Sequence, residues 1–323
     1  MRRALARRFS FQEAISMNIL NVHERVMLAS LGISVWRARR FDTRATEEVE
    51  KNHATKDIGR FNKKLLTDDA ISYKSVCSIA TQARAFFNAH TLEYDQLGVR
   101  LLPTAVYLKV ADRLREFQDE FREATSAFLA EYPALKEQAK GALNGLYTEA
   151  DYPTLEALST KFGIRLSPLP FPDASQFGIN LPANVLDGIK ADMDERVFSA
   201  VKTANEDIVG RLYDAVQHFA NRLYAGRNVR LGVVDKVREL CDLLPTLNFT
   251  QDPALTDILN ETRNHLACYT GAELKDSADL RQKVAEKAME IEAQMAVYMT
   301  GALSTPAAPA LGDSSALSFL LAS

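Results

Sequence analysis

The sequence predicts a mainly α-helical protein organised around a long antiparallel helical hairpin. Glycine and proline are sparse, at 14 and 11 of 323 residues, which favours long helices over a turn-rich β fold. From Val110 to Phe128 the apolar residues are spaced alternately by four and three, as in a coiled-coil-like helix that packs against a partner helix. A similar apolar seam runs from Ile189 to Leu223. Two such helices separated by an irregular segment are expected to fold back on each other.

Residues 1–9 form a basic arm, and residues 10–100 are expected to form an N-terminal helical region. Ser10 followed by Glu13 is a capping-box pattern, which predicts a helix start. Alternating apolar residues from Leu31 to Arg37 predict a short β element. The expected elements are a helix over 10–29, a strand over 31–37, a polar helix over 43–53, a connector over 54–66 and an amphipathic helix over 69–90.

The hairpin is expected over residues 103–225. Its first helix starts at Pro103, and Pro133 interrupts the apolar pattern, which resumes more weakly over 134–146. Residues 147–181 contain four prolines and an extended segment over 164–170, so we interpret them as a small Pro-rich insert at the hairpin tip. The second helix is expected over 184–224.

Packed helices and a flexible tail are expected after the hairpin. The region 226–300 contains helical patterns over 233–244, 254–266 and 272–299. After Gly301 the composition shifts to Ala, Ser, Pro and Gly, which indicates a flexible tail over 301–323. The tail ends in an apolar patch that either packs on its own chain or docks on a protein partner. The partner-docking candidates are Leu317, Phe319, Leu320 and Leu321.

Composition and motifs favour a cytoplasmic protein without catalytic activity. Three widely spaced cysteines on apolar helical patterns indicate buried, reduced thiols. No apolar run approaches the length of a membrane span. The sequence contains no phosphate-binding loop, nucleophile elbow, dinucleotide fingerprint or metal-ligand pair, so we expect no cofactor and no metal site.

The net charge of −3 hides a basic head on an acidic body. Residues 1–66 contain 14 Lys and Arg against 7 Asp and Glu, and the remaining residues contain 25 against 35. The head includes an arginine-rich segment with the chain's single tryptophan, and arginine and aromatic side chains together are typical of nucleic-acid binding. Alternatively, Trp36 anchors the strand to the core and the arginines pair with acidic helices. The nucleic-acid-binding candidates are Trp36, Arg37, Arg39, Arg40, Arg44, Lys63 and Lys64.

These residues also carry a resemblance to a known family. A basic, Trp-containing strand (Val35 to Arg40) precedes a helix with the spaced aromatic residues Phe117, Phe121, Phe128 and Tyr132. An insert with prolines and phenylalanines then leads into another long helix. Over roughly residues 20–250 this pattern resembles a family of uncharacterised proteins from bacteriophages and integrative mobile elements. The resemblance implies a partner more than a reaction, because members are often encoded beside a MoxR-type AAA+ ATPase and a von Willebrand factor A domain protein.

Three hypotheses about function follow from the sequence. The first is a non-enzymatic interaction or scaffold protein, accessory to an AAA+ ATPase if the resemblance holds. The second is a nucleic-acid-binding protein that uses the basic head. The third is an enzyme of unrecognised type with a site between the insert and the hairpin. The apolar seams can be filled from within the chain or by a second copy, so an oligomer is compatible with the sequence.

Overall fold

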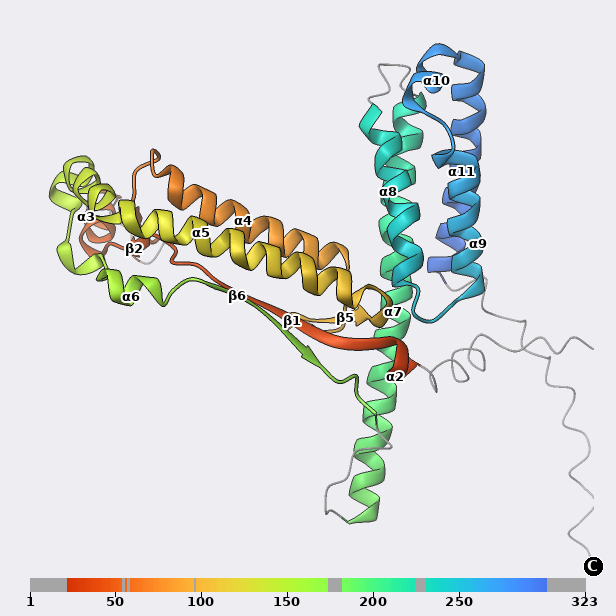
Figure 1. Cartoon of the computed structure of the whole chain (residues 1–323), viewed down its shortest axis with the longest axis horizontal. Helices are drawn as coiled ribbons and strands as arrows, with labels where there is room; N and C mark the ends of the chain where they lie inside the picture. The colour runs from red at the N-terminus through yellow and green to blue at the C-terminus, as the bar shows by residue number, and fades with distance from the viewer. Residues whose placement is uncertain are drawn as a thin grey trace, which may run out of the picture. The chain divides into compact units, whose positions relative to one another are not determined.

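The computed structural model describes residues 22–53, 56, 59–95, 97–173, 182–224 and 231–300 (Figure 1). The described chain is mainly helical with a small antiparallel sheet, which confirms the predicted fold class. It divides into two compact units. We call Val26–Phe171 the sheet unit, and Met1–Arg25 together with Pro172–Ser323 the bundle unit.

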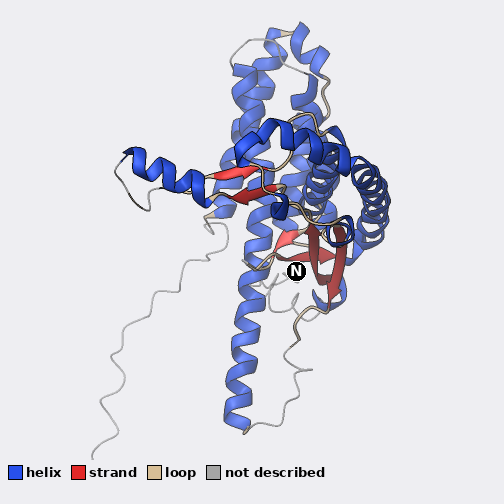
Figure 2. Ribbon diagram, turned by 90° about the vertical axis from the view of Figure 1, so that its left-hand side faces the viewer, coloured by secondary structure: helices blue, strands red, loops and turns tan. Residues whose placement is uncertain are grey.

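The sheet unit is built on β1, residues Val26–Ser34 (red strands in Figure 2). β1 pairs antiparallel with β5, Val99–Pro103, on one side and with β6, Gly163–Leu169, on the other. The short β4, Leu92–Glu93, extends the sheet beyond β5. Because β1 has a strand on each side, its apolar residues can be buried while its backbone groups are satisfied. The short helix α2, Val22–Arg25, precedes β1.

The predicted helix over 10–29 is wrong in its last part. Residues 10–21 lie outside the described residues, and residues 26–29 belong to β1. The strand predicted over 31–37 therefore begins and ends earlier than expected. Val26, Leu28 and Ala29 are buried between neighbouring strands, and this tertiary pairing outweighs the local helical pattern. The sequence could not show the partners, because β5 and β6 are distant in the chain.

The three longer helices of the sheet unit follow the sequence pattern, whereas the short fourth helix lies in the predicted insert. The helices are α3 (Thr43–His53), α4 (Ile71–Ala89), α5 (Thr104–Leu143) and α6 (Leu155–Ser159), with the short turns η1 (Asn144–Leu146) and η2 (Glu149–Asp151). The predicted seam of α5 is buried, and α5 packs against α4 and β6. Pro133 does not interrupt α5, because Leu135 and Ala139 continue the buried stripe and offset the proline's cost.

An aromatic cluster forms the core at one end of the sheet unit. Phe128 of α5 is fully buried, and its ring lies 6.3 Å from Trp36, 5.4 Å from Tyr73 and 5.7 Å from Phe162 between ring centroids. The Tyr73 hydroxyl donates to the carbonyl of Trp36 at 2.6 Å. Trp36 also meets the ring of Tyr132 edge-on at 5.8 Å. The cluster joins α4, α5 and the chain after β1.

The bundle unit is organised around α7, the longest helix of the described chain. Its helices are α7 (Ala183–Tyr224), α8 (Leu231–Leu247), α9 (Pro253–Thr262), the π-helical turn η4 (Arg263–Ala267), α10 (Gly271–Asp276) and α11 (Ala278–Met299). α7 packs against α11 and α8. Polar contacts support this packing: Gln217 donates to Glu292 at 3.1 Å, and the Tyr298 hydroxyl donates to Asp252 at 2.7 Å.

The predicted pairing of the two long helices is wrong. α5 has α4 and β6 as partners within the sheet unit, whereas α7 has α11 and α8 within the bundle unit. The seams were correctly placed, but sequence spacing does not say which helix fills a seam. The insert over 147–181 is also not a hairpin tip. Its described part supplies η2, α6 and β6, and β6 is an edge strand of the sheet.

The predicted arm over 1–9 and tail over 301–323 lie outside the described residues. The docking candidates Leu317, Phe319, Leu320 and Leu321 therefore stay predictions. The helices expected over 233–244, 254–266 and 272–299 are found, although the last is divided into α10 and α11 at Ser277. Ser277 caps α11 by accepting a hydrogen bond from the backbone N–H of Leu280.

Replacing Phe128 with alanine should destabilise the sheet unit by about 3–5 kcal/mol, because it removes a fully buried ring and leaves a cavity. Urea unfolding followed by the fluorescence of the single tryptophan, Trp36, measures this free energy. Leu108→Ala is the matched control on the same helix. Leu108 is 72% exposed, so the control should stay within about 0.5 kcal/mol. Equal stability of the two variants would contradict the described core.

Candidate functional site

A two-stranded antiparallel ribbon carries most of the predicted nucleic-acid-binding residues. It consists of β2, Arg39–Phe41, and β3, Asn62–Lys64. Arg39 lies opposite Lys64, Arg40 opposite Lys63, and Phe41 opposite Asn62. The pairing extends by one hydrogen bond at each end, from Leu65 N–H to the Ala38 carbonyl at 2.8 Å and from Asp42 N–H to the Phe61 carbonyl at 2.9 Å. We call residues 38–42 and 61–65 the ribbon.

Residues that lie opposite each other in an antiparallel pair share one face, so the ribbon has two distinct faces. The inner face includes Ala38, Leu65, Asp42 and Lys63, all of which are buried. Ala38 and Leu65 belong to the same core as the aromatic cluster. Ala38 adopts a left-handed backbone conformation with φ of 50°, at the point where the chain changes direction between β1 and β2.

Lys63 is held at the centre of the inner face by three acceptors. Its Nζ lies 2.8 Å from Asp42 Oδ2 and 2.8 Å from Asp151 Oδ2, and it donates to the Leu146 carbonyl at 2.7 Å. An ammonium group has three donors, so this site uses its whole capacity. The lysine side chain is only 5% exposed. Lys63 therefore ties the ribbon to η1 and η2 and is not accessible to a ligand.

The ionisation of this cluster follows from its geometry. Burial alone would lower the pKa of Lys63, but hydrogen bonds to Asp151 and Asp42 outweigh burial and raise the pKa. The hydrogen bond from Lys63 lowers the pKa of Asp42, as does the bond from the backbone N–H of Ala45. This second bond makes Asp42 the N-terminal cap of α3.

The outer face of the ribbon is exposed and carries two cations. Its members are Arg39, Phe41, Asn62 and Lys64. Arg39 and Lys64 lie directly opposite each other, an arrangement that is unfavourable for like charges. Lys64 forms an exposed ion pair with Asp68 at 3.0 Å, whereas Arg39 forms no ion pair with any described residue. Arg40, opposite Lys63, belongs to the inner face but is 66% exposed, and its Nε lies 3.5 Å from Asp151 Oδ1.

Two exposed phenyl rings lie on opposite faces of the ribbon: Phe41 is on the outer face, and Phe61, opposite Asp42, is on the inner face, where a hollow adjoins it. Phe41 and Phe61 are 44% and 42% exposed, and the Arg60 guanidinium lies 6.0 Å from the centre of the Phe41 ring. A mostly apolar hollow of about 450 Å³ separates α3 from the segment before β3. Its lining residues are Thr46, Val49, Glu50, His53, Gly59, Arg60 and Phe61.

The structure separates the sequence candidates into two groups. Trp36 and Lys63 are parts of the core, which agrees with the alternative interpretation of Trp36 as an anchor. Arg37, Arg39, Arg40, Arg44 and Lys64 are exposed. Phe41 belongs to the arginine-rich segment that the sequence singles out, although it is not among the nucleic-acid-binding candidates, whereas sequence reasoning missed Arg60 and Phe61 altogether. The sequence signal that could have identified Arg60 and Phe61 is their place directly before Asn62 and Lys63. This segment falls within the connector predicted over 54–66.

A second candidate surface is an apolar stripe at the start of α7. Leu186, Ile189 and Met193 lie on one face and are partly exposed, and the buried stripe of the helix continues from them at Val197. The buried residues of α7 begin at Val197 and continue to Leu223. Figures 1 and 2 both show the first turns of α7 extending beyond α8 and α11. We call Leu186, Ile189 and Met193 the α7 stripe.

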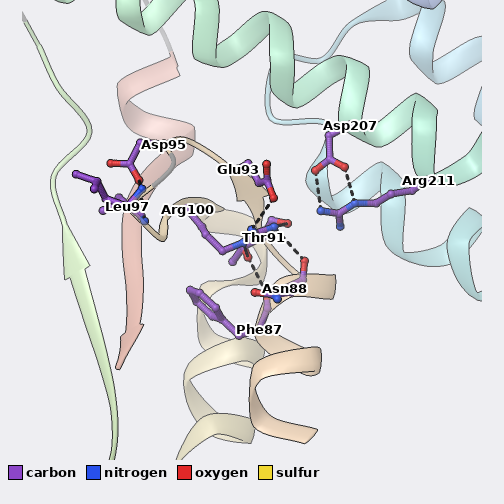
Figure 3. Close-up of polar contacts among 10 residues, drawn as sticks. Phe87, Asn88, Thr91, Glu93, Asp95, Leu97, Arg100, Asp207 and Arg211 are labelled. Carbon is purple, nitrogen blue, oxygen red and sulfur yellow. Dashed lines mark hydrogen bonds and ion pairs between the residues drawn. The ribbon is translucent and has the colours of Figure 1, made fainter. Parts of the chain in front are cut away.

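Other polar contacts have structural roles (Figure 3). Within the sheet unit, Arg100 donates to the Thr91 hydroxyl at 2.6 Å and pairs with Glu93 at 3.6 Å. The Asp95 carboxylate accepts from the backbone N–H groups of Leu97 and Val99, which closes the turn between β4 and β5. Within α7, Arg211 and Asp207 form a two-point ion pair at 2.7 and 3.0 Å. These contacts fix the local structure of each segment.

Among the described residues no group of three His, Cys, Asp or Glu side chains is placed to hold a metal ion. No described helix has the length and apolar character needed to cross a membrane. Cys241 is buried, and burial raises its pKa to about 11. The prediction of three buried thiols is wrong for Cys268, which is exposed.

Comparison of the chain with protein-family models, curated proteins and solved structures found no match. The resemblance to the family from bacteriophages and mobile elements therefore stays a prediction.

Replacing Lys63 with methionine should destabilise the sheet unit by about 3–5 kcal/mol, because the buried Asp42 and the largely covered Asp151 lose their counter-charge. Lys64→Met, at the exposed neighbouring position, should change stability by less than about 0.5 kcal/mol. Unfolding in urea at neutral pH measures both. If the two variants were equally stable, Lys63 would not be the anchor described above.

The same variant should change the response to acid. The pKa of Asp42 is lowered in the folded state from its ordinary value of 3.8. The ionised carboxylate therefore contributes to stability above pH 3.8, and this contribution is lost as the pH falls through the lower pKa of the folded state. Without Lys63 the main cause of the lowering is gone. The loss of stability between neutral pH and about pH 3 should therefore be smaller in Lys63→Met than in the parent chain. A steeper loss in the variant would contradict this assignment.

Proposed function

We propose that this chain is a non-enzymatic interaction protein whose α7 stripe binds an α-helix of a protein partner. The observation that carries the proposal is the continuity of one apolar face along α7. From Val197 to Leu223 this face carries buried residues, and α11 and α8 pack against the helix. Before Val197 the same face continues through the α7 stripe, which is partly exposed.

The spacing of the stripe suits a helical ligand. Leu186, Ile189 and Met193 occupy positions i, i+3 and i+7, the anchor pattern of helix-to-helix recognition. Val185, beside the stripe, is 44% exposed and widens the apolar surface. Methionine adapts its shape to different neighbours, which favours a binding surface over a unique core contact.

The charge around the stripe specifies the chemistry of the partner. The first turns of α7 carry four acidic residues, Asp187, Asp192, Asp194 and Glu195, against two basic ones, Lys190 and Arg196. An acidic helix with an apolar stripe is complementary to a basic amphipathic helix. The partner we propose is therefore a protein that presents such a helix.

The resemblance stated above suggests which protein to test first. It points to a MoxR-type AAA+ ATPase, with a von Willebrand factor A domain protein as the second choice. This part of the proposal rests on the resemblance alone, whereas the α7 stripe rests on the burial pattern of the helix. Testing the stripe by substitution keeps the two parts separate.

Ile189→Asp should reduce binding to the MoxR-type ATPase of the same genome at least about tenfold, because one anchor contributes about 1.5–3 kcal/mol when buried. Binding is measured by co-purification and then by titration with the purified ATPase. Ala191→Asp is the matched control, since Ala191 is exposed on the opposite side of the same turns.

Equal binding by Ile189→Asp and Ala191→Asp would contradict the α7 stripe as the docking surface. Absence of binding by the parent chain to either protein would contradict the partner named here. Sedimentation of the parent chain and of Ile189→Asp tests a second copy as the occupant. A dimer that becomes a monomer on this substitution would overturn the proposal of a different protein.

A further inference from the structure

We propose that the outer face of the ribbon binds single-stranded nucleic acid, with phosphates on Arg39 and Lys64 and an unpaired base stacked on Phe41. This inference goes beyond the protein-binding role of α7, because it concerns the sheet unit and uses different residues. It also differs from the sequence hypothesis, because Trp36 and Lys63 are excluded and Phe41, Arg60 and Phe61 are included.

The first argument is the unequal neutralisation of the two faces. On the inner face, Lys63 is neutralised by the buried Asp42 and by Asp151, which is 13% exposed. On the outer face, Arg39 and Lys64 lie opposite each other, and their one ion pair with a described residue is that of Lys64 with the exposed Asp68. Exposed ion pairs are weak and are screened by salt, so a phosphate can replace Asp68 at Lys64. An anion between Arg39 and Lys64 would convert their repulsion into a favourable contact.

The second argument is the charge of the surrounding surface. Residues 37–64 contain nine Lys and Arg against five Asp and Glu. Of the cations, Arg37, Arg44 and Arg60 are exposed and form no ion pair with described residues. They flank the ribbon at both ends, where they can contact phosphates further along a bound strand.

The third argument distinguishes a nucleic acid from other polyanions. Phe41 shares the outer face with Arg39 and Lys64, so a phenyl ring and two cations are presented together. Stacking of bases on aromatic rings beside a basic surface is the general mode of single-strand binding. An acidic peptide would use the cations but would gain little from the ring. A duplex would not expose base faces to it.

The hollow beside the ribbon supports the same ligand. Its mostly apolar lining includes Phe61, and Arg60 lies at its edge while also facing the Phe41 ring. A volume of about 450 Å³ is within the range of small-ligand pockets, so it can accept a base that is turned out of the strand. Arg60 would then lie between two stacked groups, where its planar guanidinium can contact both.

The test uses the full chain and fluorescently labelled oligonucleotides of about 20 nucleotides, longer than a typical single-strand site. The probes are oligo-dT, oligo-U and a duplex of the same length, with binding followed by fluorescence anisotropy. The double variant R39E/K64E should weaken binding of the single strands at least about tenfold. Phe41→Ala should weaken it about fivefold or more, because one stacked base is lost.

The matched control is K109E/K161E, which changes the net charge by the same amount. Lys109 and Lys161 are exposed in the same unit and are not part of the ribbon. This control changes the net charge without touching the ribbon. Because net charge alone has a smaller effect on binding, the control should bind within about twofold of the parent chain. Thermal unfolding of every variant checks that the exposed substitutions leave the fold intact.

Affinity of the parent chain should fall steeply as salt rises from about 50 to 200 mM, as expected when phosphates release counterions. Equal weakening by R39E/K64E and K109E/K161E would overturn the ribbon as the site. Tighter binding of the duplex, or equal competition by poly-glutamate, would overturn the assignment to single-stranded nucleic acid. Oligo-dT and oligo-U distinguish DNA from RNA as the source of the strand.

Discussion

The ion cluster of Lys63, Asp42 and Asp151 is the constraint on which the candidate nucleic-acid site depends. A buried charge is tolerated only when it is paired and fully hydrogen-bonded, and Lys63 meets this condition with three acceptors. One of its partners also caps α3, and another belongs to η2. The cluster therefore fixes three segments at once. A ribbon of three residues per strand would otherwise be too short to be stable.

This constraint gives the two faces of the ribbon different roles. The inner face is tied to the core, so the outer face is presented in a fixed register with its cations and phenyl ring side by side. Binding gains from such preorganisation, because less order has to be imposed when the ligand arrives. The α7 stripe follows the same logic in the bundle unit, since its first turns continue a helix that is held rigid by α8 and α11.

The sequence predicted the helices well because each long apolar seam is recorded in local spacing. α3, α4 and α7 were predicted within a few residues of their bounds, as was the start of α5, which continues past the interruption expected at Pro133. The partners of the seams could not be predicted, so the pairing of α5 with α7 was wrong. The start of β1 was missed because Val26 and Leu28 are strand residues only in the presence of β5 and β6. For the candidate nucleic-acid site, the sequence correctly identified the arginines that are exposed. Lys63 was misassigned because its acceptors come from Asp42, Asp151 and Leu146, the last two remote in sequence.

The most direct test of this account is the ionisation of Lys63 in the intact chain, measured by NMR titration of lysine side chains. We predict that the pKa of Lys63 lies above the ordinary value of 10.5 and that its ammonium protons are protected from exchange. A Lys63 that titrates below the exposed lysines would contradict the account. The lysine would then be neutral or unpaired in the folded protein, and the inner face could not hold the ribbon in place.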